Sequence, residues 1–215
     1  MTLARTWLPC AGLAVGIALL SGGVAGVLTV PSPRDVGTVP EARTHSAPLT
    51  TVRAAAPAQE PPPAAAFAPA QAPLRVRIPT LSVNAPVVPV DTAPDNTLTV
   101  PEDPATVGWW SAGAWPGDRH GTVVLAGHVD TDEAGAGALF RLNDLRPGDV
   151  VALQTAQGTL SYRVRALRHY PKRTLPAETF DHSGAPRLVL ITCGGRFDVR
   201  NREYTDNVVA YATSP

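Results

Sequence analysis

The strongest constraint on this chain is a series of short apolar runs, each about the length of one β-strand, that starts at Leu74. Leu74, Val76 and Ile78 alternate with arginines, as expected for a half-buried strand. Turn residues separate successive runs about every ten positions, a spacing typical of an all-β sandwich or barrel. The strands are predicted at residues 74–78, 83–90, 98–100, 122–126, 150–153, 160–167, 188–192 and 208–211. Two short helices are expected, at residues 137–142 and 177–180.

The N-terminal segment 7–30 contains no charged residue. As an α-helix it is about 35 Å long, enough to cross the hydrocarbon core of a bilayer. Arg5 precedes it and the next basic residue is Arg34, which favours a cytoplasmic N-terminus. We therefore expect residues 1–30 to be a membrane anchor with a signal-anchor helix at 7–30. A cleaved signal peptide is the alternative, because small residues between 21 and 26 permit cleavage.

Residues 31–73 are rich in proline and alanine and include three consecutive prolines, Pro61 to Pro63. Such a composition buries little apolar surface and favours an extended, semi-rigid spacer. We predict a disordered linker at 31–73 and a single folded domain at 74–215. A domain of about 140 residues is large enough to bury a substantial core without disulfides or metals.

The composition argues against several classes of function. The 18 acidic and 18 basic residues balance, so no basic face for nucleic acid is indicated. A zinc site requires three or four ligands in a recognisable pattern, and the five histidines are scattered. No glycine-rich phosphate loop is present. The sequence therefore predicts no metal, no cofactor and no nucleic-acid partner.

Two predicted strands end in chemically reactive side chains. His128 follows the run 122–126, and Cys193 follows the run 188–192 and precedes Gly194 and Gly195. The other cysteine, Cys10, lies in the predicted membrane helix, so Cys193 becomes an unpaired thiol in an exported domain. Catalytic residues often lie where a rigid strand meets a loop.

A cysteine and a histidine that meet in space form a nucleophilic pair, because the thiolate attacks and the imidazole transfers protons. The glycines after Cys193 leave backbone N–H groups available to an oxyanion. The alternative is a purely structural role for both residues. In that case His128 forms its hydrogen bonds within a turn, and Cys193 packs as a small apolar residue. The tryptophans Trp109 and Trp110 either line a substrate groove or pack against the core.

These motifs, in this order and at this separation, resemble the sortase family, and among its groups the actinobacterial class F. The resemblance covers nearly all of Leu74 to Ala212 and includes "RIPTLSVNAPVVPV", "VGWWSAGAWPG", "LFRLNDLRPGDVV" and "DNVVAYA". It implies an eight-stranded β-barrel. It also implies a transpeptidase that cleaves a C-terminal sorting signal of the Leu-Pro-x-Thr-Gly type. The acyl group passes through a cysteine thioester to an amine acceptor.

The resemblance assigns roles to individual residues. It implies Cys193 as the acyl-carrying nucleophile and His128 as the general acid and base. Many relatives carry an arginine two positions before the asparagine of "DNVV", where this chain has Thr205. The nearest candidate for that arginine is Arg202, with Arg200 and Arg196 further back. The residues next to the nucleophile are expected to contact substrate: Thr192, Gly194 and Gly195.

The expected partners are surface proteins that bear sorting signals, an amine acceptor in the cell wall or on a protein, and the membrane itself. The expected location is the cell membrane, with a single span and the catalytic domain outside the cytoplasm. Two alternatives remain. Thr205 in place of arginine favours a non-catalytic extracellular binding module. An L,D-transpeptidase also uses cysteine and histidine, but its Ser-x-Gly-Cys motif differs from the sequence around Cys193.

Overall fold

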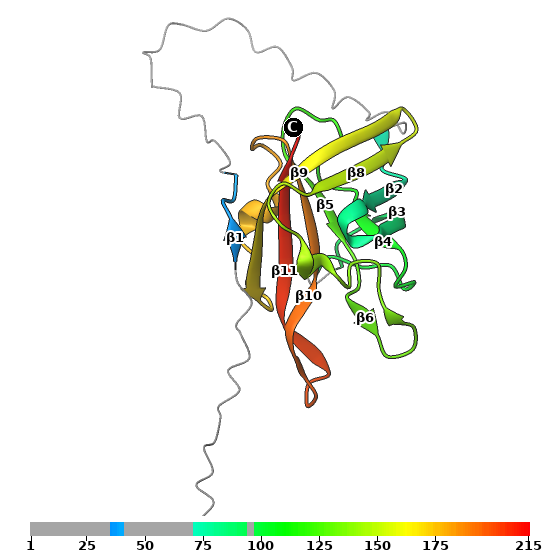
Figure 1. Cartoon of the computed structure of the whole chain (residues 1–215), viewed down its shortest axis with the longest axis vertical. Helices are drawn as coiled ribbons and strands as arrows, with labels where there is room; N and C mark the ends of the chain where they lie inside the picture. The colour runs from blue at the N-terminus through cyan, green and yellow to red at the C-terminus, as the bar shows by residue number, and fades with distance from the viewer. Residues whose placement is uncertain (1–34, 41–70, 94–96) are drawn as a thin grey trace, which may run out of the picture. The chain divides into compact units, whose positions relative to one another are not determined.

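The computed structural model describes residues 35–40, 71–93 and 97–215, and its main feature is a closed antiparallel and parallel β-barrel (Figure 1). The strands lie in the order β9-β11-β10-β5-β4-β3-β2-β8, and β8 pairs again with β9 to close the ring. The predicted all-β, eight-stranded barrel is therefore confirmed. Its strands are β2 (Arg75–Ile78), β3 (Val83–Val90), β4 (Val107–Trp110), β5 (Thr122–Ala126), β8 (Val150–Thr155), β9 (Gly158–Pro171), β10 (Arg187–Asp198) and β11 (Glu203–Thr213).

Part of the predicted linker belongs to the fold. Within 31–73, the short strand β1 (Val36–Gly37) pairs antiparallel with β9, opposite Leu167 and Ala166. The Arg168 guanidinium donates to both carbonyls of β1, at 2.7 Å each. β8 pairs with β9 only as far as Arg163, so the edge beyond it has backbone groups for another strand. Residues 35–40 are thus ordered against the barrel, contrary to the prediction of an entirely disordered linker.

The predicted membrane helix at 7–30 lies outside the described residues. Within residues 35–40, 71–93 and 97–215, no helix has the length and apolar character needed to span a bilayer.

One strand was predicted in the wrong place. Residues 98–100 form only an isolated bridge between Leu98 and Thr92, while β4 forms further along the chain. Both faces of β4 are covered, so its sequence shows no alternation of apolar and polar residues. Trp109 is buried and stacks edge-on with Trp115 at 4.7 Å, and Trp110 stacks on Phe180 at 5.4 Å. The tryptophan pair therefore packs the two faces of β4.

The helices that lie wholly within the described residues are 3-10 turns. They are η2 (Pro79–Leu81), η3 (Leu142–Asp144) and η4 (Ala177–Phe180). The helix predicted at 137–142 is replaced by η3, because the chain before it forms a small hairpin of β6 (Asp130–Thr131) and β7 (Gly135–Ala136). The glycines of this segment permit the turn, and Gly135 has a φ of 73°.

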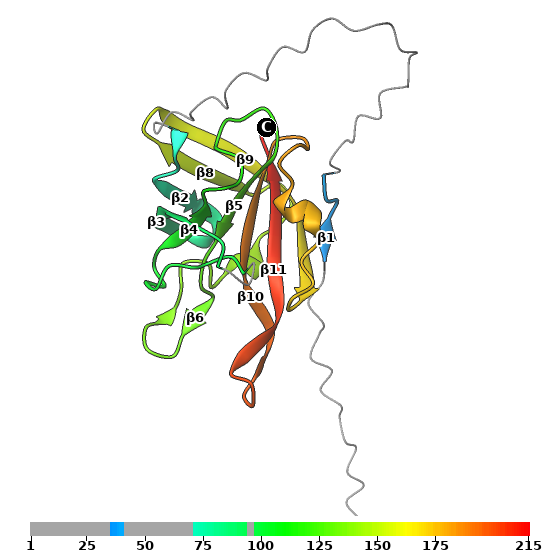
Figure 2. The ribbon, with the colours of Figure 1, turned by 180° about the vertical axis from the view of Figure 1, so that it is seen from behind.

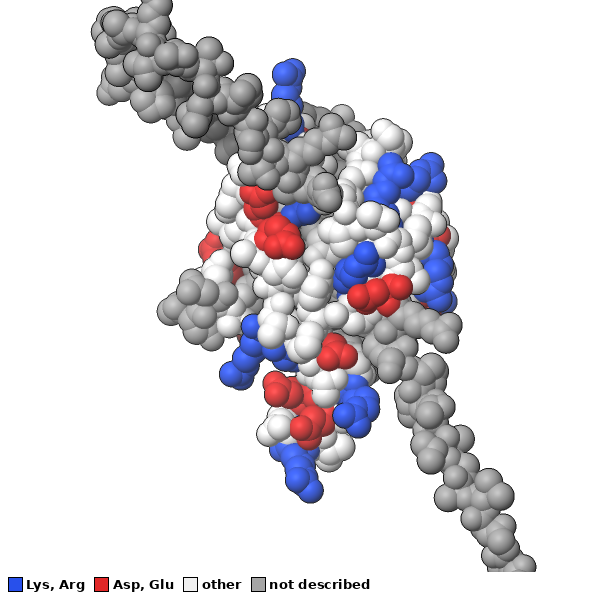
Figure 3. All heavy atoms as spheres, turned by 90° about the vertical axis from the view of Figure 1, so that its left-hand side faces the viewer, with Lys and Arg blue, Asp and Glu red and all other residues white. Residues whose placement is uncertain are grey.

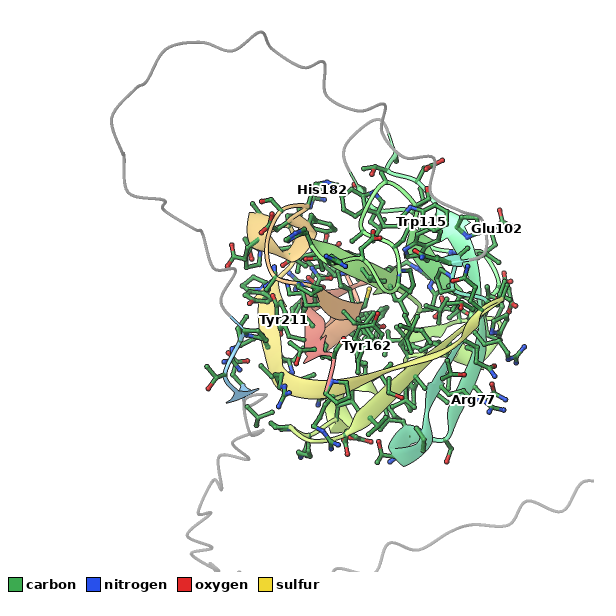
Figure 4. All side chains as sticks on the ribbon, turned by 90° about the horizontal axis from the view of Figure 1, so that it is seen from above. Arg77, Glu102, Trp115, Tyr162, His182 and Tyr211 are labelled. Carbon is green, nitrogen blue, oxygen red and sulfur yellow. The ribbon has the colours of Figure 1, made fainter. Side chains whose placement is uncertain are left out.

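The apolar residues form two layers, one inside the barrel and one outside it. On β10, Leu188 and Leu190 point into the barrel, whereas Val189 and Ile191 belong to the outer cluster. The view from above in Figure 4 shows the strands as a ring around buried Tyr162, with exposed Arg77 at its outer side. Burial on both faces explains why β10 reads as a continuous apolar run. Figure 2 shows β10 and β11 side by side along the barrel.

We predict that Leu153→Ala lowers the free energy of unfolding by about 2–5 kcal/mol. Leu153 is fully buried and lies opposite Val76 on one side and Leu160 on the other, where the barrel closes. Urea unfolding followed by circular dichroism measures the change. Val199→Ala is the control, because Val199 is 78% exposed and its truncation leaves stability nearly unchanged. Equal stability of the two variants would contradict this account of barrel closure.

Candidate active site

The site is built on two neighbouring parallel strands. β5 and β10 pair in parallel, with Ala126 opposite Ile191 at the end of the shared ladder. His128 lies two residues after Ala126, and Cys193 lies two residues after Ile191. Parallel strands in register end at the same edge of a sheet, so the pairing delivers imidazole and thiol to the same end of the barrel.

Two hydrogen bonds extend the pairing beyond the ladder. The Gly127 N–H donates to the Ile191 carbonyl at 3.1 Å, and the Thr192 hydroxyl donates to the Gly127 carbonyl at 2.8 Å. Thr192, expected to contact substrate, is 4% exposed. Its hydroxyl therefore fastens the residue before Cys193 to the residue before His128.

His128 is held by a backbone carbonyl. Its Nε2 lies 2.8 Å from the oxygen of Pro101, which packs beside Gly108 of the neighbouring strand β4. A carbonyl oxygen only accepts, so Nε2 carries the proton in this hydrogen bond. In the neutral ring, Nδ1 is then the nitrogen that accepts a proton. The Pro101 carbonyl thus fixes both the tautomer and the orientation of the ring.

Cys193 and His128 line the same cleft, which has a volume of about 280 Å³. Its walls come from the β6 segment and from the β10–β11 hairpin, which extend from the same end of the barrel (Figures 1 and 2). The lining residues are His128, Val129, Asp130, Thr131, Asp132, Lys172, Cys193, Phe197, Arg202, Glu203 and Tyr204. The half-buried thiol therefore opens into a space with polar and apolar walls.

Lys172 is the functional candidate that the sequence interpretation missed. Its ammonium lies 3.0 Å from the Cys193 sulfur and lines the same cleft. A signal was present in the sequence: Lys172 is the single lysine among the 18 lysine and arginine residues of the chain. Its contact with Cys193 depends on the pairing of β9 with β11, which the spacing of residues does not reveal.

Arg202 lines the cleft but is engaged elsewhere. It lies in the turn between β10 and β11 with a left-handed φ of 53°, and its guanidinium pairs with the Asp132 carboxylate. Both side chains are 73% exposed. The predicted role of Arg202 at the oxyanion remains a prediction, and its observed contact is an ion pair across the cleft mouth.

The glycines after the nucleophile meet a close neighbour on β11. A side chain at Gly195 would collide with the Thr205 hydroxyl and the Asp206 carboxylate, and its φ is 78°. A side chain at Gly194 would collide with Val208. Both positions therefore require glycine, and of the two only Gly195, two residues after Cys193, is exposed.

Tyr204 and Asp130 connect the two walls of the cleft. The Tyr204 hydroxyl donates to the Asp130 carboxylate at 2.6 Å, and its ring packs edge-on against Phe197. This hydrogen bond, together with burial and the nearby negative charges, raises the pKa of Tyr204 to about 12. Beyond the cleft, acidic and basic side chains are interspersed over the face in Figure 3, without a large area of one sign.

In the described part of the chain, no group of histidine, cysteine, aspartate and glutamate side chains is arranged to hold a metal ion. The reactive groups that line the cleft include a thiol, an imidazole and an ammonium ion.

A β-barrel with a cysteine and a histidine at the ends of adjacent parallel strands defines the class of the protein, and sequence comparison gives its family. The sortase domain family matches residues 76–214, so the chain belongs to the sortase family. Members of this family are cysteine transpeptidases. No curated protein sequence matches the chain.

Solved structures agree on the fold. Sortase C-1 from Actinomyces oris has a TM-score of 0.52 and 20% identity, covering 66% of this chain and 72% of its own. A lid mutant of sortase A from Corynebacterium diphtheriae has a TM-score of 0.52 and 19% identity, covering 66% and 68%. Sortase C1 of Streptococcus agalactiae, in a complex with MTSET, has a TM-score of 0.52 and 17% identity, covering 66% and 67%. These likenesses establish the fold and do not distinguish class F from other sortase classes.

We predict that Asp130→Asn lowers the pKa of Tyr204 from about 12 toward its ordinary value of 10. The carboxylate stabilises the neutral phenol, so loss of its charge makes ionisation easier. Ultraviolet absorbance of phenolate during alkaline titration measures the shift, with Tyr204→Phe in the same background identifying the signal. An unchanged Tyr204 titration in Asp130→Asn would contradict the hydrogen bond as its main cause.

Proposed function

We propose that this chain is a membrane-anchored sortase of class F type that cleaves a C-terminal sorting signal and joins the released acyl group to an amine. The signal is of the Leu-Pro-x-Thr-Gly kind, and the acyl group is carried as a thioester on Cys193. One observation carries the proposal: Cys193 and His128 follow register partners on adjacent parallel strands and line one cleft.

The chemistry follows from these two side chains. The thiol proton passes to Nδ1 of His128, and the thiolate attacks the threonine carbonyl carbon. The new C–S bond moves an electron pair onto the carbonyl oxygen, and in this proposal backbone N–H groups near Gly194 stabilise it. Collapse of this intermediate breaks the C–N bond, and His128 gives its proton to the departing glycine amine. A thioester on Cys193 remains.

The second half reverses these steps with a new amine. The acceptor attacks the thioester and loses a proton to His128, the C–S bond breaks to release the conjugate, and His128 returns the proton to the Cys193 sulfur. The Pro101 carbonyl supports this cycle because it keeps Nδ1 as the exchanging nitrogen. The acceptor in this proposal is an amine of the cell wall or of a protein.

The proposed location at the membrane is inferred from the N-terminal sequence. The uncharged segment 7–30, preceded by Arg5, supports a single span with the barrel outside the cytoplasm. A tethered enzyme suits substrates that are themselves held at the membrane, such as surface proteins with C-terminal sorting signals.

We expect the full-length chain, in detergent micelles, to form a covalent conjugate between a Leu-Pro-x-Thr-Gly peptide and a glycine-based amine. Cys193→Ala abolishes both cleavage and conjugation, because no thioester forms. His128→Gln lowers the turnover number about 10²–10⁴-fold through loss of proton transfer. Liquid chromatography with mass spectrometry quantifies both products.

Asp149→Asn, outside the cleft, serves as the control and keeps wild-type turnover. Peptide binding without cleavage across a panel of signals, unaffected by Cys193→Ala, would instead support a binding module. Turnover of a peptidoglycan stem peptide in place of the sorting signals would support the L,D-transpeptidase alternative.

A further inference from the structure

We propose that Lys172 supplies, as a protonated amine, the positive charge of the acyl-transfer centre, first beside the Cys193 thiolate and then beside the oxyanion. This inference rests on the proposed function and adds a catalytic residue to it. The observation behind it is the distance of 3.0 Å from Lys172 Nζ to Cys193 Sγ, inside the cleft.

Strand pairing fixes the backbone position of Lys172. It follows the last residue of β9, and its N–H donates to the Thr205 carbonyl on β11 at 2.9 Å. β11 in turn pairs with β10, where Asn207 lies opposite Cys193 and Asp206 opposite Gly194. The long lysine stem therefore extends past one strand to reach the sulfur on the next.

A cation at this point has two uses. An ammonium beside sulfur favours the charged, nucleophilic form of the thiol. When the thiolate attacks, the carbonyl carbon bonds to that sulfur. The new oxyanion and the sulfur are then bonded to the same carbon atom. The flexible four-carbon stem lets the same ammonium donate to this oxygen.

The other cation of the cleft is poorly placed for this task. Arg202 pairs with Asp132 at the exposed mouth, whereas Lys172 contacts the thiol itself. Position 205 carries no charge, and its hydroxyl accepts from the Arg196 N–H at 3.1 Å. The Lys172 N–H donates to the Thr205 carbonyl. The positive charge of its side chain therefore reaches the site from the end of β9, next to position 205 on β11.

Lys172 keeps its proton throughout the reaction. The moving proton passes from the thiol to His128 and then to the leaving amine, while the C–S bond forms and the C–N bond breaks. A neutral amine at this distance would attack the thioester, break the C–S bond and leave a stable amide on Lys172. A protonated amine has no lone pair for that attack, so the thioester survives until the acceptor arrives.

The test compares four variants of the full-length chain in detergent micelles, all in a Cys10→Ser background so that Cys193 is the remaining thiol. Lys172→Met removes the charge and keeps the length, and Lys172→Arg keeps the charge but cannot act as a base. The double variant Lys172→Met with Thr205→Arg moves the cation to β11. Arg119→Met is the matched control, because it removes one charge from an exposed side chain outside the cleft.

Two rates and one mass are measured. We expect Lys172→Met to slow iodoacetamide alkylation of Cys193 about tenfold and to lower kcat/KM for a Leu-Pro-x-Thr-Gly peptide about 100-fold. Lys172→Arg stays within about tenfold of the parent, and Thr205→Arg restores at least about tenfold to the Met variant. Arg119→Met matches the parent. Peptide mapping of the trapped intermediate places the acyl group on Cys193.

Thermal unfolding confirms that each variant is folded before its rates are compared. The proposal is overturned if Lys172→Met alkylates and turns over like Arg119→Met. It is also overturned if both arginine variants are as slow as Lys172→Met, or if the acyl group is found on Lys172. Absence of peptide turnover in the parent chain contradicts the proposed function instead, and the alkylation rates still decide whether Lys172 controls the thiol.

Discussion

The parallel, in-register pairing of β5 with β10 is the constraint on which the site depends. The pairing of Ala126 with Ile191 sets the register. The hydrogen bond from the Thr192 hydroxyl to the Gly127 carbonyl extends this alignment by one residue. A slip of one residue would turn every side chain of either strand to the opposite face. The buried leucines and valines of both strands make such a slip costly, so the core that stabilises the barrel also aligns the imidazole with the thiol.

The cleft is completed by two hairpins that lack this support from the core. The Tyr204 hydroxyl on Asp130 and the Arg202 pair with Asp132 join the β6 segment to the β10–β11 hairpin. The Arg202 pair is exposed, and exposed ion pairs contribute about 0–1 kcal/mol. The cleft therefore combines a base held by the core of the barrel with a mouth whose ion pair contributes little stability.

Much of the fold could be predicted because its strands are buried on one or two faces and separated by turn residues. His128 and Cys193 could be identified because each follows such a strand. β4 was missed because "VGWW" has no alternation, and its two tryptophans cover opposite faces. The contact of β1 with β9 was missed because a short edge strand carries no periodic pattern of its own.

The cation beside the thiol was the least predictable part. Arg202 is the arginine nearest in sequence to position 205, whereas Lys172 reaches the sulfur through strand pairing. A three-dimensional neighbour on a different strand leaves little trace in local sequence. The one indication of Lys172 in the sequence is that it is the single lysine of the chain.

The most direct measurement of the central claim is a crystal structure of the full-length chain with a sorting-signal peptide bonded to its thiol, using a thiol-reactive group in place of the threonine carbonyl. The account predicts a bond to Cys193 Sγ. It also predicts His128 Nδ1 facing the departing side of the adduct and Lys172 Nζ within hydrogen-bond distance of its oxygen. An adduct whose reacting carbon lies away from His128, on another face of the barrel, would contradict it.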